Sequence, residues 1–328
     1  MFPIPKFNGP FNVILPQYIN YKRSLGYNYG RSIIYRLAEM NRFFIDKGID
    51  EKKIPKHIFL EWIKLKNNES VSNQEKRYIT IHGFAKYLIQ NGYNDVYDEI
   101  NPVIKASSDF IPYIYTKEEI KKIFDAADNL KTIEKIYDYQ HHLILPVLMR
   151  LLYSTGLRIS EALNLKLQDI DFKSGDLRIL DGKNHVSRMV VVSKTMKKVL
   201  CNYYRNSITF SSEKDYLFHS RFGKKYKYGT VNRLFHQILL MAGISRKVSG
   251  NFPRLHDLRH VFSIRALEQM EQKGYDLYTT LPFLSKYLGH KSIVETEHYI
   301  RLTKMSFKRI TDTFNNYSSE IFPCIEEE

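Results

Sequence analysis

The chain has 328 residues and a formal net charge of +15 at pH 7, with a pI near 9.5. This length suggests two or three domains, and 43% hydrophobic residues can build their cores, which argues against a globally disordered chain. The excess of Lys and Arg favours a polyanionic partner such as nucleic acid, because each phosphate that a cation neutralises releases a bound counterion.

The two cysteines and the apolar segments limit the location of the protein. Cys201 and Cys324 are far apart and have no neighbouring metal-ligand pattern, which argues against a disulfide scaffold or a zinc site and fits a reducing cytosol. The first residues lack the basic and apolar regions of a signal peptide. The longest apolar stretch, 143–153, is too short to span a membrane and contains Arg150. We therefore expect a cytoplasmic protein that needs no membrane.

The first hundred residues predict helices only. Apolar residues recur at helical spacing in 11–25, 31–47, 54–67 and 73–91, which indicates a small four-helix domain over 1–104. Ser72 and Glu75 have the spacing of a capping box that opens the fourth helix. Basic residues on these helices either face DNA or form solvated surfaces; the DNA-binding candidates are Lys22, Arg23, Lys76 and Arg77.

The remainder predicts a second domain of helices with a small sheet. The stretch 101–112 contains two prolines and a serine pair, which is typical of a linker between domains. Thr116 and Glu119 predict a capping box, followed by a helix over 118–130. The segments 169–180 and 183–192 have strand patterns with turn signals at Ser174-Gly175 and Asp181-Gly182, which predict a small antiparallel sheet. Further helices are expected over 141–154, 159–166, 194–206, 229–242, 256–272, 279–288 and 292–300.

Arg158 and Lys183 are the first two residues of this domain with possible chemical roles. Arg158 opens a short helix after Gly156, where a guanidinium beside free backbone N–H groups suits an oxyanion such as phosphate. The alternative is a surface arginine paired with Glu161. Lys183 follows a predicted hairpin turn, from which an ammonium can reach a cleft and donate a proton, although exposed lysines are commonplace there. Neither residue decides the chemistry alone.

The segment HDLRH, residues 256–260, brings a base and a guanidinium together. His256 and Arg259 share a helix face, and His260 lies one turn from His256. Phosphoryl transfer needs this combination, because a proton must move while charge on the phosphate oxygens is stabilised. The two histidines could instead bind zinc, but a metalloprotease helix has Glu where this chain has Asp257, and Arg259 would place a cation beside the metal. We therefore expect no metal.

His290 and Tyr299 form the last cluster, in the segment YLGHKSIVETEHYIR. Tyr299 follows His290 by nine residues. The chain has 24 tyrosines, most of which we expect to pack in cores. A phenol with an ordinary pKa of about 10 also needs help to attack anything at neutral pH.

Together, the ordered set Arg, Lys, His-x-x-Arg, His and Tyr resembles the active site of the tyrosine recombinase (phage integrase) family, in its compact Xer-like or transposon-type form. Flanking residues strengthen the resemblance: TGLRISEALNL around Arg158, HDLRH, LGHKS, and Thr296 three residues before Tyr299. The resemblance covers about 113–300. The four preceding helices are similar to the family's core-binding domain only in length and pattern.

The resemblance implies how the phosphate and the leaving group are handled. Arg158 and Arg259 would clamp the scissile phosphate, and His290 would hydrogen-bond it. His256 would take part in proton transfer, and Lys183 would protonate the departing 5′-oxygen.

It also implies the role of the nucleophile and its supports. Tyr299 would form a 3′-phosphotyrosyl bond, with Glu161 and His260 supporting the residues that touch the phosphate. Because that bond preserves the energy of the phosphodiester, rejoining needs no ATP, metal or other cofactor.

One segment departs from the family pattern. The hairpin that often reads GKGxKxR is GKNHVSR here and matches only at Gly182, Lys183 and Arg188. Lys183 is the one lysine of this turn, so its assignment is unambiguous but rests on fewer matches. Arg188 is a further candidate for DNA binding.

We therefore expect a mainly α protein with a small antiparallel β-sheet, built as a two-domain clamp on double-stranded DNA. It would be a site-specific recombinase that works as a homotetramer on two sites. The catalytic domain would cover 113–315 and a tail 316–328. The alternatives are a type IB topoisomerase and a catalytically idle DNA-binding relative. An apolar stripe before the tail, at Phe307, Ile310 and Phe314, either packs on its own domain or docks on a neighbouring protomer.

Overall fold

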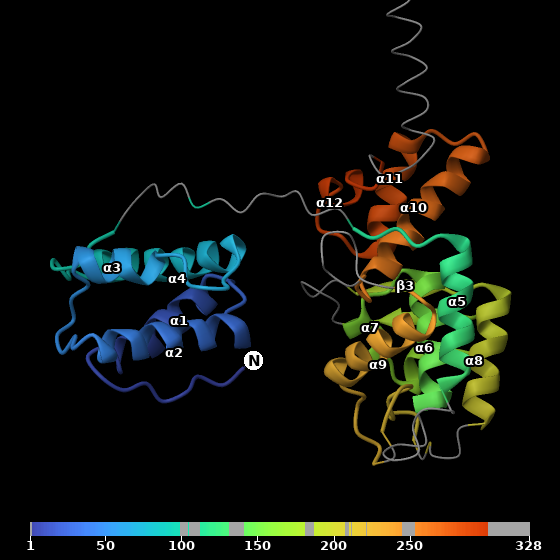
Figure 1. Cartoon of the computed structure of the whole chain (residues 1–328), viewed down its shortest axis with the longest axis horizontal. Helices are drawn as coiled ribbons and strands as arrows, with labels where there is room; N and C mark the ends of the chain where they lie inside the picture. Colours follow the sequence, from blue (N-terminus) through green and yellow to red (C-terminus); the bar gives the residue numbers. More distant parts are fainter. Residues whose placement is uncertain are drawn as a thin grey trace, which may run out of the picture. The chain divides into compact units, whose positions relative to one another are not determined.

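The structure is a computed structural model of the chain (Figure 1) and describes residues 2–98, 104, 112–130, 141–180, 187–206, 210, 212–220, 222–244 and 253–300. The chain divides into two compact units, Met1–Phe110 and Ile111–Glu328. Lys183, the apolar stripe after residue 300 and the predicted tail lie outside the described residues.

The first unit contains the four predicted helices: α1 (Ile14–Ser24), α2 (Arg31–Asp46), α3 (Lys56–Ile63) and α4 (Val71–Gln90). In Figure 1, α1 and α2 form one layer and α3 and α4 the other. Aromatic side chains fill the space between the helices, and the ring of Phe11 lies 5.5 Å from that of Phe44 and 5.3 Å from that of Phe84. This core is separate from that of the second unit.

The start of α4 differs from the prediction. The N-cap is Ser70, whose hydroxyl accepts a hydrogen bond from the backbone N–H of Asn73, and the helix begins at Val71. Ser72 is therefore already helical, and the predicted capping box with Glu75 is wrong. Both serines precede an apolar run, so the residue pattern alone allowed either start.

Arg77 is a structural residue and not one that faces DNA, which corrects the prediction. It is 1% exposed, and its guanidinium donates to both carboxylate oxygens of Glu69, at 2.8 and 2.6 Å, and to the carbonyl of Lys64. These hydrogen bonds hold the pKa of Glu69 at about 2. A buried guanidinium needs such pairing, so Arg77 joins the start of α4 to the end of α3.

The other basic candidates of this unit differ in their surroundings. Arg23 donates to the carbonyls of Phe2 and Tyr29, which ties down the N-terminal segment. The Lys22 ammonium lies 5.2 Å from the ring centre of Tyr27, and Lys76 is exposed. Lys22 and Lys76 thus stay candidates for DNA contact.

The second unit begins at the predicted capping box. Thr116 and Glu119 exchange side-chain and backbone hydrogen bonds at the start of α5 (Lys117–Asp128), which confirms that prediction. The other helices are α6 (His141–Thr155), α7 (Ile159–Asn164), the 3-10 turn η2 (Leu167–Asp169), α8 (Lys194–Asn206), α9 (Tyr228–Met241), α10 (Asp257–Gln272), α11 (Leu277–Leu288) and α12 (Val294–Glu297).

A small antiparallel sheet is set among these helices. Its strands are β1 (Ile170–Asp171), β2 (Asp176–Ile179) and β3 (Arg188–Val191), hydrogen-bonded in that order. Leu177 pairs with both Ile170 and Val190, and all three are buried in the large core of the unit. The predicted turn at Ser174-Gly175 is present, with Gly175 in the left-handed region at φ +88°. The mainly helical fold class is confirmed.

Two features position the site. A small second core, formed by α10, α11 and the end of the described chain, encloses Tyr299 with Ile264, Leu267, Leu284 and Leu288. Gly156 ends α6 in the left-handed region, at φ +61°, and turns the chain toward Arg158. No helix in the described ranges is long and apolar enough to cross a membrane.

We predict that Gly156→Ala destabilises the protein more than Gly243→Ala. Both glycines have left-handed φ angles near +65°, so each substitution costs about 1–2 kcal/mol of backbone strain. Only at Gly156 would the new methyl group meet another residue, 2.3 Å from Cδ1 of Phe262, which adds about 1–3 kcal/mol. Urea denaturation of the full chain measures the difference, and equal losses would show that the Phe262 contact is unimportant.

Candidate active site

Glu161 is shared between two arginines. Arg158 precedes α7 and donates to the Glu161 carboxylate from its backbone N–H, at 2.9 Å, and from its guanidinium, at 3.0 Å. Arg188, the first residue of β3, donates to both oxygens of the same carboxylate, at 3.0 and 2.9 Å. Burial alone would raise the pKa of Glu161, but the hydrogen bonds and charges of the two arginines outweigh it and lower that pKa. One carboxylate thus holds two guanidinium groups in place.

Arg188 is a structural part of this site and not a DNA-facing residue, which corrects the prediction. Its side chain is 7% exposed, and its Nε donates to the carbonyl of Tyr287 at 2.6 Å. A methyl group on Gly289 would stand only 2.9 Å from the guanidinium, so Arg188 is also held by close contact with that glycine. The residue links β3 to the segment that leads to His290.

Arg259 lies on α10 and is a buried cation. It is 2% exposed and donates to the carbonyls of Gly156, at 2.7 Å, and Leu288, at 2.8 Å, and to Nε2 of His290, at 2.9 Å. Within the described part of the chain it forms no ion pair with a carboxylate. Burial and the charge of Arg158 lower its pKa to about 10, so Arg259 still carries its charge at neutral pH. A buried charge of this kind is stabilised by an anion.

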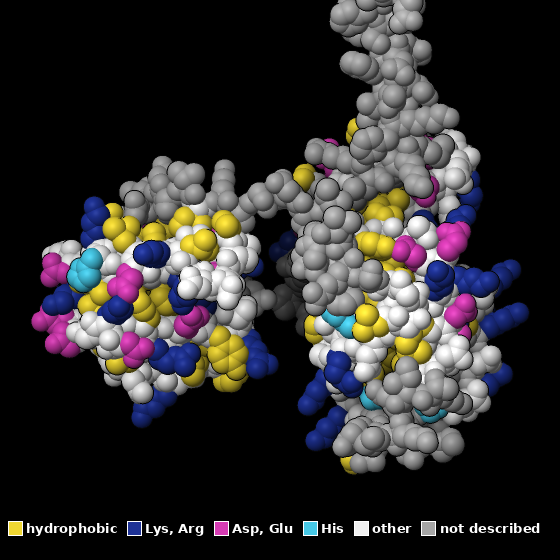
Figure 2. Space-filling view, in the orientation of Figure 1, with side chains coloured by type: hydrophobic (Ala, Val, Ile, Leu, Met, Phe, Trp, Pro, Cys, Tyr) yellow, Lys and Arg dark blue, Asp and Glu magenta, His cyan; other side chains and the backbone are white. Residues whose placement is uncertain are grey.

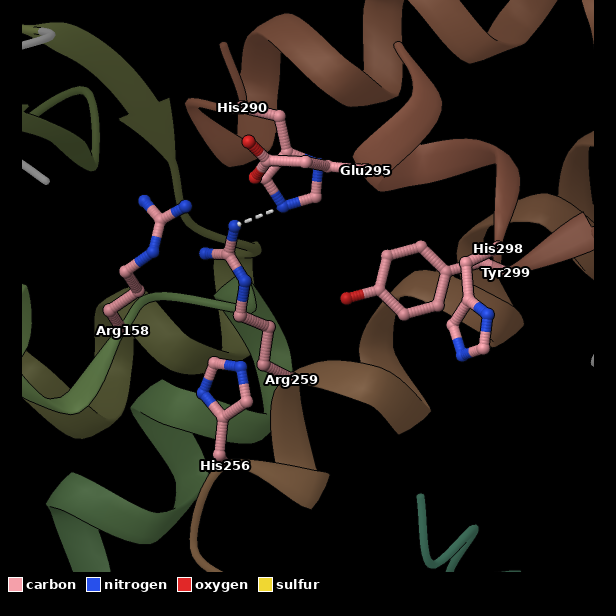
Figure 3. Close-up of a pocket in the computed structure, with 7 residues that line it drawn as sticks. All are labelled: Arg158, His256, Arg259, His290, Glu295, His298 and Tyr299. Carbon is pink, nitrogen blue, oxygen red and sulfur yellow. Dashed lines mark hydrogen bonds between the residues drawn. The ribbon is translucent and has the colours of Figure 1, made fainter. Parts of the chain in front are cut away.

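Tyr299 directs its hydroxyl toward the guanidinium of Arg259 (Figure 3). The residue is 3% exposed, and its hydroxyl lies 3.2 Å from Nδ1 of His260. Burial raises the pKa of Tyr299, while the charge of Arg259 and hydrogen bonds from Ser263 and Arg259 act in the opposite direction. The phenol is therefore protonated at neutral pH and must lose its proton to a base before it can attack.

His256 completes the group of basic side chains. Its ring lies 4.9 Å from that of His260 and nearly perpendicular to it. Although part of the His256 side chain is exposed, burial by the surrounding protein and the nearby charges of His260 and Arg259 lower its pKa to about 4. The imidazole is therefore neutral at neutral pH and can accept a proton.

These side chains line one pocket of about 390 Å³, the active-site pocket (Figure 3). Five of its seven lining residues were predicted from the sequence; the full set is Arg158, His256, Arg259, His290, Glu295, His298 and Tyr299. Two predicted residues contact the lining of this pocket: Glu161 accepts a hydrogen bond from Arg158, and His260 is at hydrogen-bond distance from the hydroxyl of Tyr299. Among the described residues, no group of three or more His, Cys, Asp or Glu side chains could hold a metal ion.

Comparison with known proteins identifies the family. The model of the phage integrase family matches residues 114–305, more than half of the chain. The chain belongs to the phage integrase family.

Relatives of this integrase are named as integrases or recombinases. It is 29% identical over 318 residues, 92% of this chain and 96% of the relative, to a Sinorhizobium fredii protein named "Putative integrase/recombinase y4rB". It is also 29% identical to the tyrosine recombinase XerA of Pyrococcus furiosus, over 72% of this chain and 73% of the relative. Its activity is that of a tyrosine-type site-specific recombinase, which cleaves and rejoins DNA.

Solved structures share the fold of the integrase. The XerH recombinase bound to its palindromic difH substrate has a TM-score of 0.64 at 17% identity, over 96% of this chain and 99% of the other. The Tn1549 transposon integrase in complex with transposon right end DNA also has a TM-score of 0.64, at 15% identity, over 91% and 98% of the two chains.

Sequence reasoning missed two residues that line the pocket of this integrase, Glu295 and His298. Both precede Tyr299 closely, Glu295 by one helical turn and His298 by one residue, and this spacing was the available signal. A carboxylate and an extra histidine beside a phosphate site are not part of the motifs that carried the resemblance.

We predict that His256 titrates far below the ordinary histidine pKa of about 6.5 in the free integrase, near 4. An anion such as vanadate in the active-site pocket should raise this pKa, because it offsets the positive charge of Arg259 and stabilises the imidazolium. The ring-carbon NMR signals of His256, followed with pH, measure both values. Titration at or above the ordinary pKa without an anion would contradict the proposed electrostatics of the pocket.

Proposed function

We propose that Tyr299 cleaves one strand of duplex DNA by attacking the scissile phosphate. The tyrosine oxygen forms a bond to phosphorus while the bond to the 5′-oxygen breaks, which leaves a 3′-phosphotyrosyl linkage and a free 5′-hydroxyl. Attack by a 5′-hydroxyl reverses these steps and rejoins the strand. One observation carries this proposal: the hydroxyl of Tyr299 points toward the guanidinium of Arg259, in a pocket that Arg158 and His290 also line.

The arginines supply the electrostatic part of the mechanism. Arg158, Arg188 and Arg259 bring three positive charges, and Glu161 brings one negative charge, so these four residues have a net charge of +2 (3 − 1). Arg158 and Arg259 line the pocket and would bind the non-bridging oxygens of the phosphate. Because protein contacts already hold both guanidinium groups, little reorganisation is needed as charge develops in the transition state.

The histidines would handle the proton of the nucleophile. Nδ1 of His260 is at hydrogen-bond distance from the Tyr299 hydroxyl and would receive its proton first. His256, neutral at neutral pH and close to His260, stays available for proton transfer at the phosphate. His290 would bind a phosphate oxygen. For the leaving 5′-oxygen, the resemblance of the hairpin indicates Lys183 as the proton donor.

Duplex DNA and further copies of the chain would be the partners. The excess of positive charge supports a polyanionic partner. In Figure 2, Lys and Arg side chains project from the edge of the second unit where Figure 1 places α8, a helix with four basic and no acidic residues. In relatives of the same fold, a lambda integrase tetramer is bound to a Holliday junction. We infer that four copies of this chain act on two sites, with 1–104 as a DNA-binding domain and 113–315 as the catalytic domain.

Replacing Tyr299 by Phe tests the proposal directly. Tyr299→Phe should abolish the covalent protein–DNA adduct on a nicked suicide substrate and leave DNA affinity within about twofold, because the hydroxyl is the attacking group and contributes little to binding. Tyr287→Phe is the matched control, since Tyr287 is also a largely buried tyrosine of this unit whose carbonyl, not its hydroxyl, binds Arg188. An adduct that persists in Tyr299→Phe would disprove the assignment.

A further inference from the structure

Thr296 connects His290 to the segment that carries the nucleophile. Its side chain is fully buried, at 0% exposed, and Oγ1 lies 2.7 Å from Nδ1 of His290. Its carbonyl accepts from the backbone N–H of Tyr299 at 2.9 Å, and its own N–H donates to the carbonyl of Ile293 at 2.7 Å. One residue therefore holds His290 by its side chain and Tyr299 by its main chain.

The second ring nitrogen of His290 fixes the direction of this hydrogen bond. Nε2 lies 2.9 Å from the Arg259 guanidinium, which can only donate, so Nε2 must be the acceptor and cannot carry a proton. The proton of the neutral ring is then on Nδ1, and Nδ1–H donates to Oγ1 of Thr296. In this arrangement the hydroxyl of Thr296 acts as the acceptor.

We propose that Thr296 is a positioning residue for DNA cleavage, which holds His290 so that Nε2 faces Arg259 and the phosphate site. This proposal rests on the role given above to His290 at the phosphate. It adds a requirement beyond the residues that touch the phosphate, because His290 must be oriented before it can bind a phosphate oxygen.

A hydroxyl is suited to this position because it can also donate. When phosphate enters, it takes up donors of Arg259, and Nε2 of His290 must then present a proton to a phosphate oxygen. His290 meets this need without a change of net charge if its proton moves from Nδ1 to Nε2 by exchange. The Thr296 hydroxyl then turns and donates to the bare Nδ1, so no buried polar atom loses its partner in either state.

Removing the hydroxyl should therefore affect cleavage more than binding. Valine has the shape of threonine but no hydroxyl, and at this fully buried position it would place a methyl group where Nδ1 of His290 has a hydrogen-bond partner. We expect Thr296→Val to slow adduct formation on a suicide substrate by at least about tenfold, with DNA affinity within about twofold. Thr296→Ser keeps the hydroxyl and should stay within about threefold of the unmodified integrase.

Thr280→Val is the matched control for the loss of a buried threonine hydroxyl. Thr280 is 8% exposed on α11, and its hydroxyl donates to the carbonyl of Leu277 at 3.0 Å, away from the pocket-lining residues. The control should lose comparable stability but keep its cleavage rate. If Thr296→Val and Thr280→Val slow cleavage equally, the role of Thr296 is only structural and the proposal fails.

The tautomer of His290 gives a readout that does not depend on any variant folding. In the free integrase, the ¹⁵N NMR shifts of His290 should place the proton on Nδ1, and a proton on Nε2 would overturn the proposal. The outcomes also separate this proposal from the proposed function. If the unmodified protein forms no adduct, the assignment of the nucleophile fails; if it forms the adduct and Thr296→Val does so at the same rate, only the role of Thr296 fails.

Discussion

The buried positive charge of Arg259 is the constraint on which the site depends. A guanidinium out of contact with water is costly unless its donors are satisfied, and two of the acceptors here are the carbonyls of Gly156 and Leu288. Gly156 follows the last residue of α6, and Leu288 is the last residue of α11. Carbonyls at the C-terminal end of a helix have no partner within the helix and carry partial negative charge. Two helix ends thus stabilise the cation without neutralising it, and the remaining charge is available for phosphate.

The same logic explains the glycines at these helix ends. Gly156 and Gly289 both have left-handed φ angles, and a side chain at either would collide with a neighbour, Phe262 at the first and Arg188 at the second. The two turns bring Arg158 and His290 to the same pocket as Arg259 from helices that are distant in the sequence. Glu161 then spaces Arg158 from Arg188, because both guanidinium groups bind its single carboxylate. Cleavage chemistry therefore rests on backbone geometry as much as on the charged side chains.

The ordered motifs predicted most of this site because each combines a reactive residue with its local backbone signal. Arg158 follows the glycine that ends a helix, and the spacing of His256, Arg259 and His260 is visible along one helix. The helices and the capping box at Thr116 could be predicted for the same reason, since their signals are local. Arg77 and Arg188 were wrongly predicted to face DNA because the sequence alone does not distinguish an exposed basic residue from one that is buried against a carboxylate. The partners that decide, Glu69 for Arg77 and Glu161 for Arg188, become evident only once the chain is folded.

If the active-site pocket delivers a phosphate to Tyr299, the DNA must become attached to this tyrosine, and the site of covalent attachment is the most direct test. The integrase would be trapped on a nicked suicide substrate, digested with nuclease and trypsin, and analysed by mass spectrometry. The tryptic peptide 292–301 contains a single tyrosine, Tyr299, so its modification is unambiguous. We predict that the added nucleotide mass is found on this peptide. Attachment to a peptide with any other tyrosine, in a preparation that cleaves the substrate, would contradict the account.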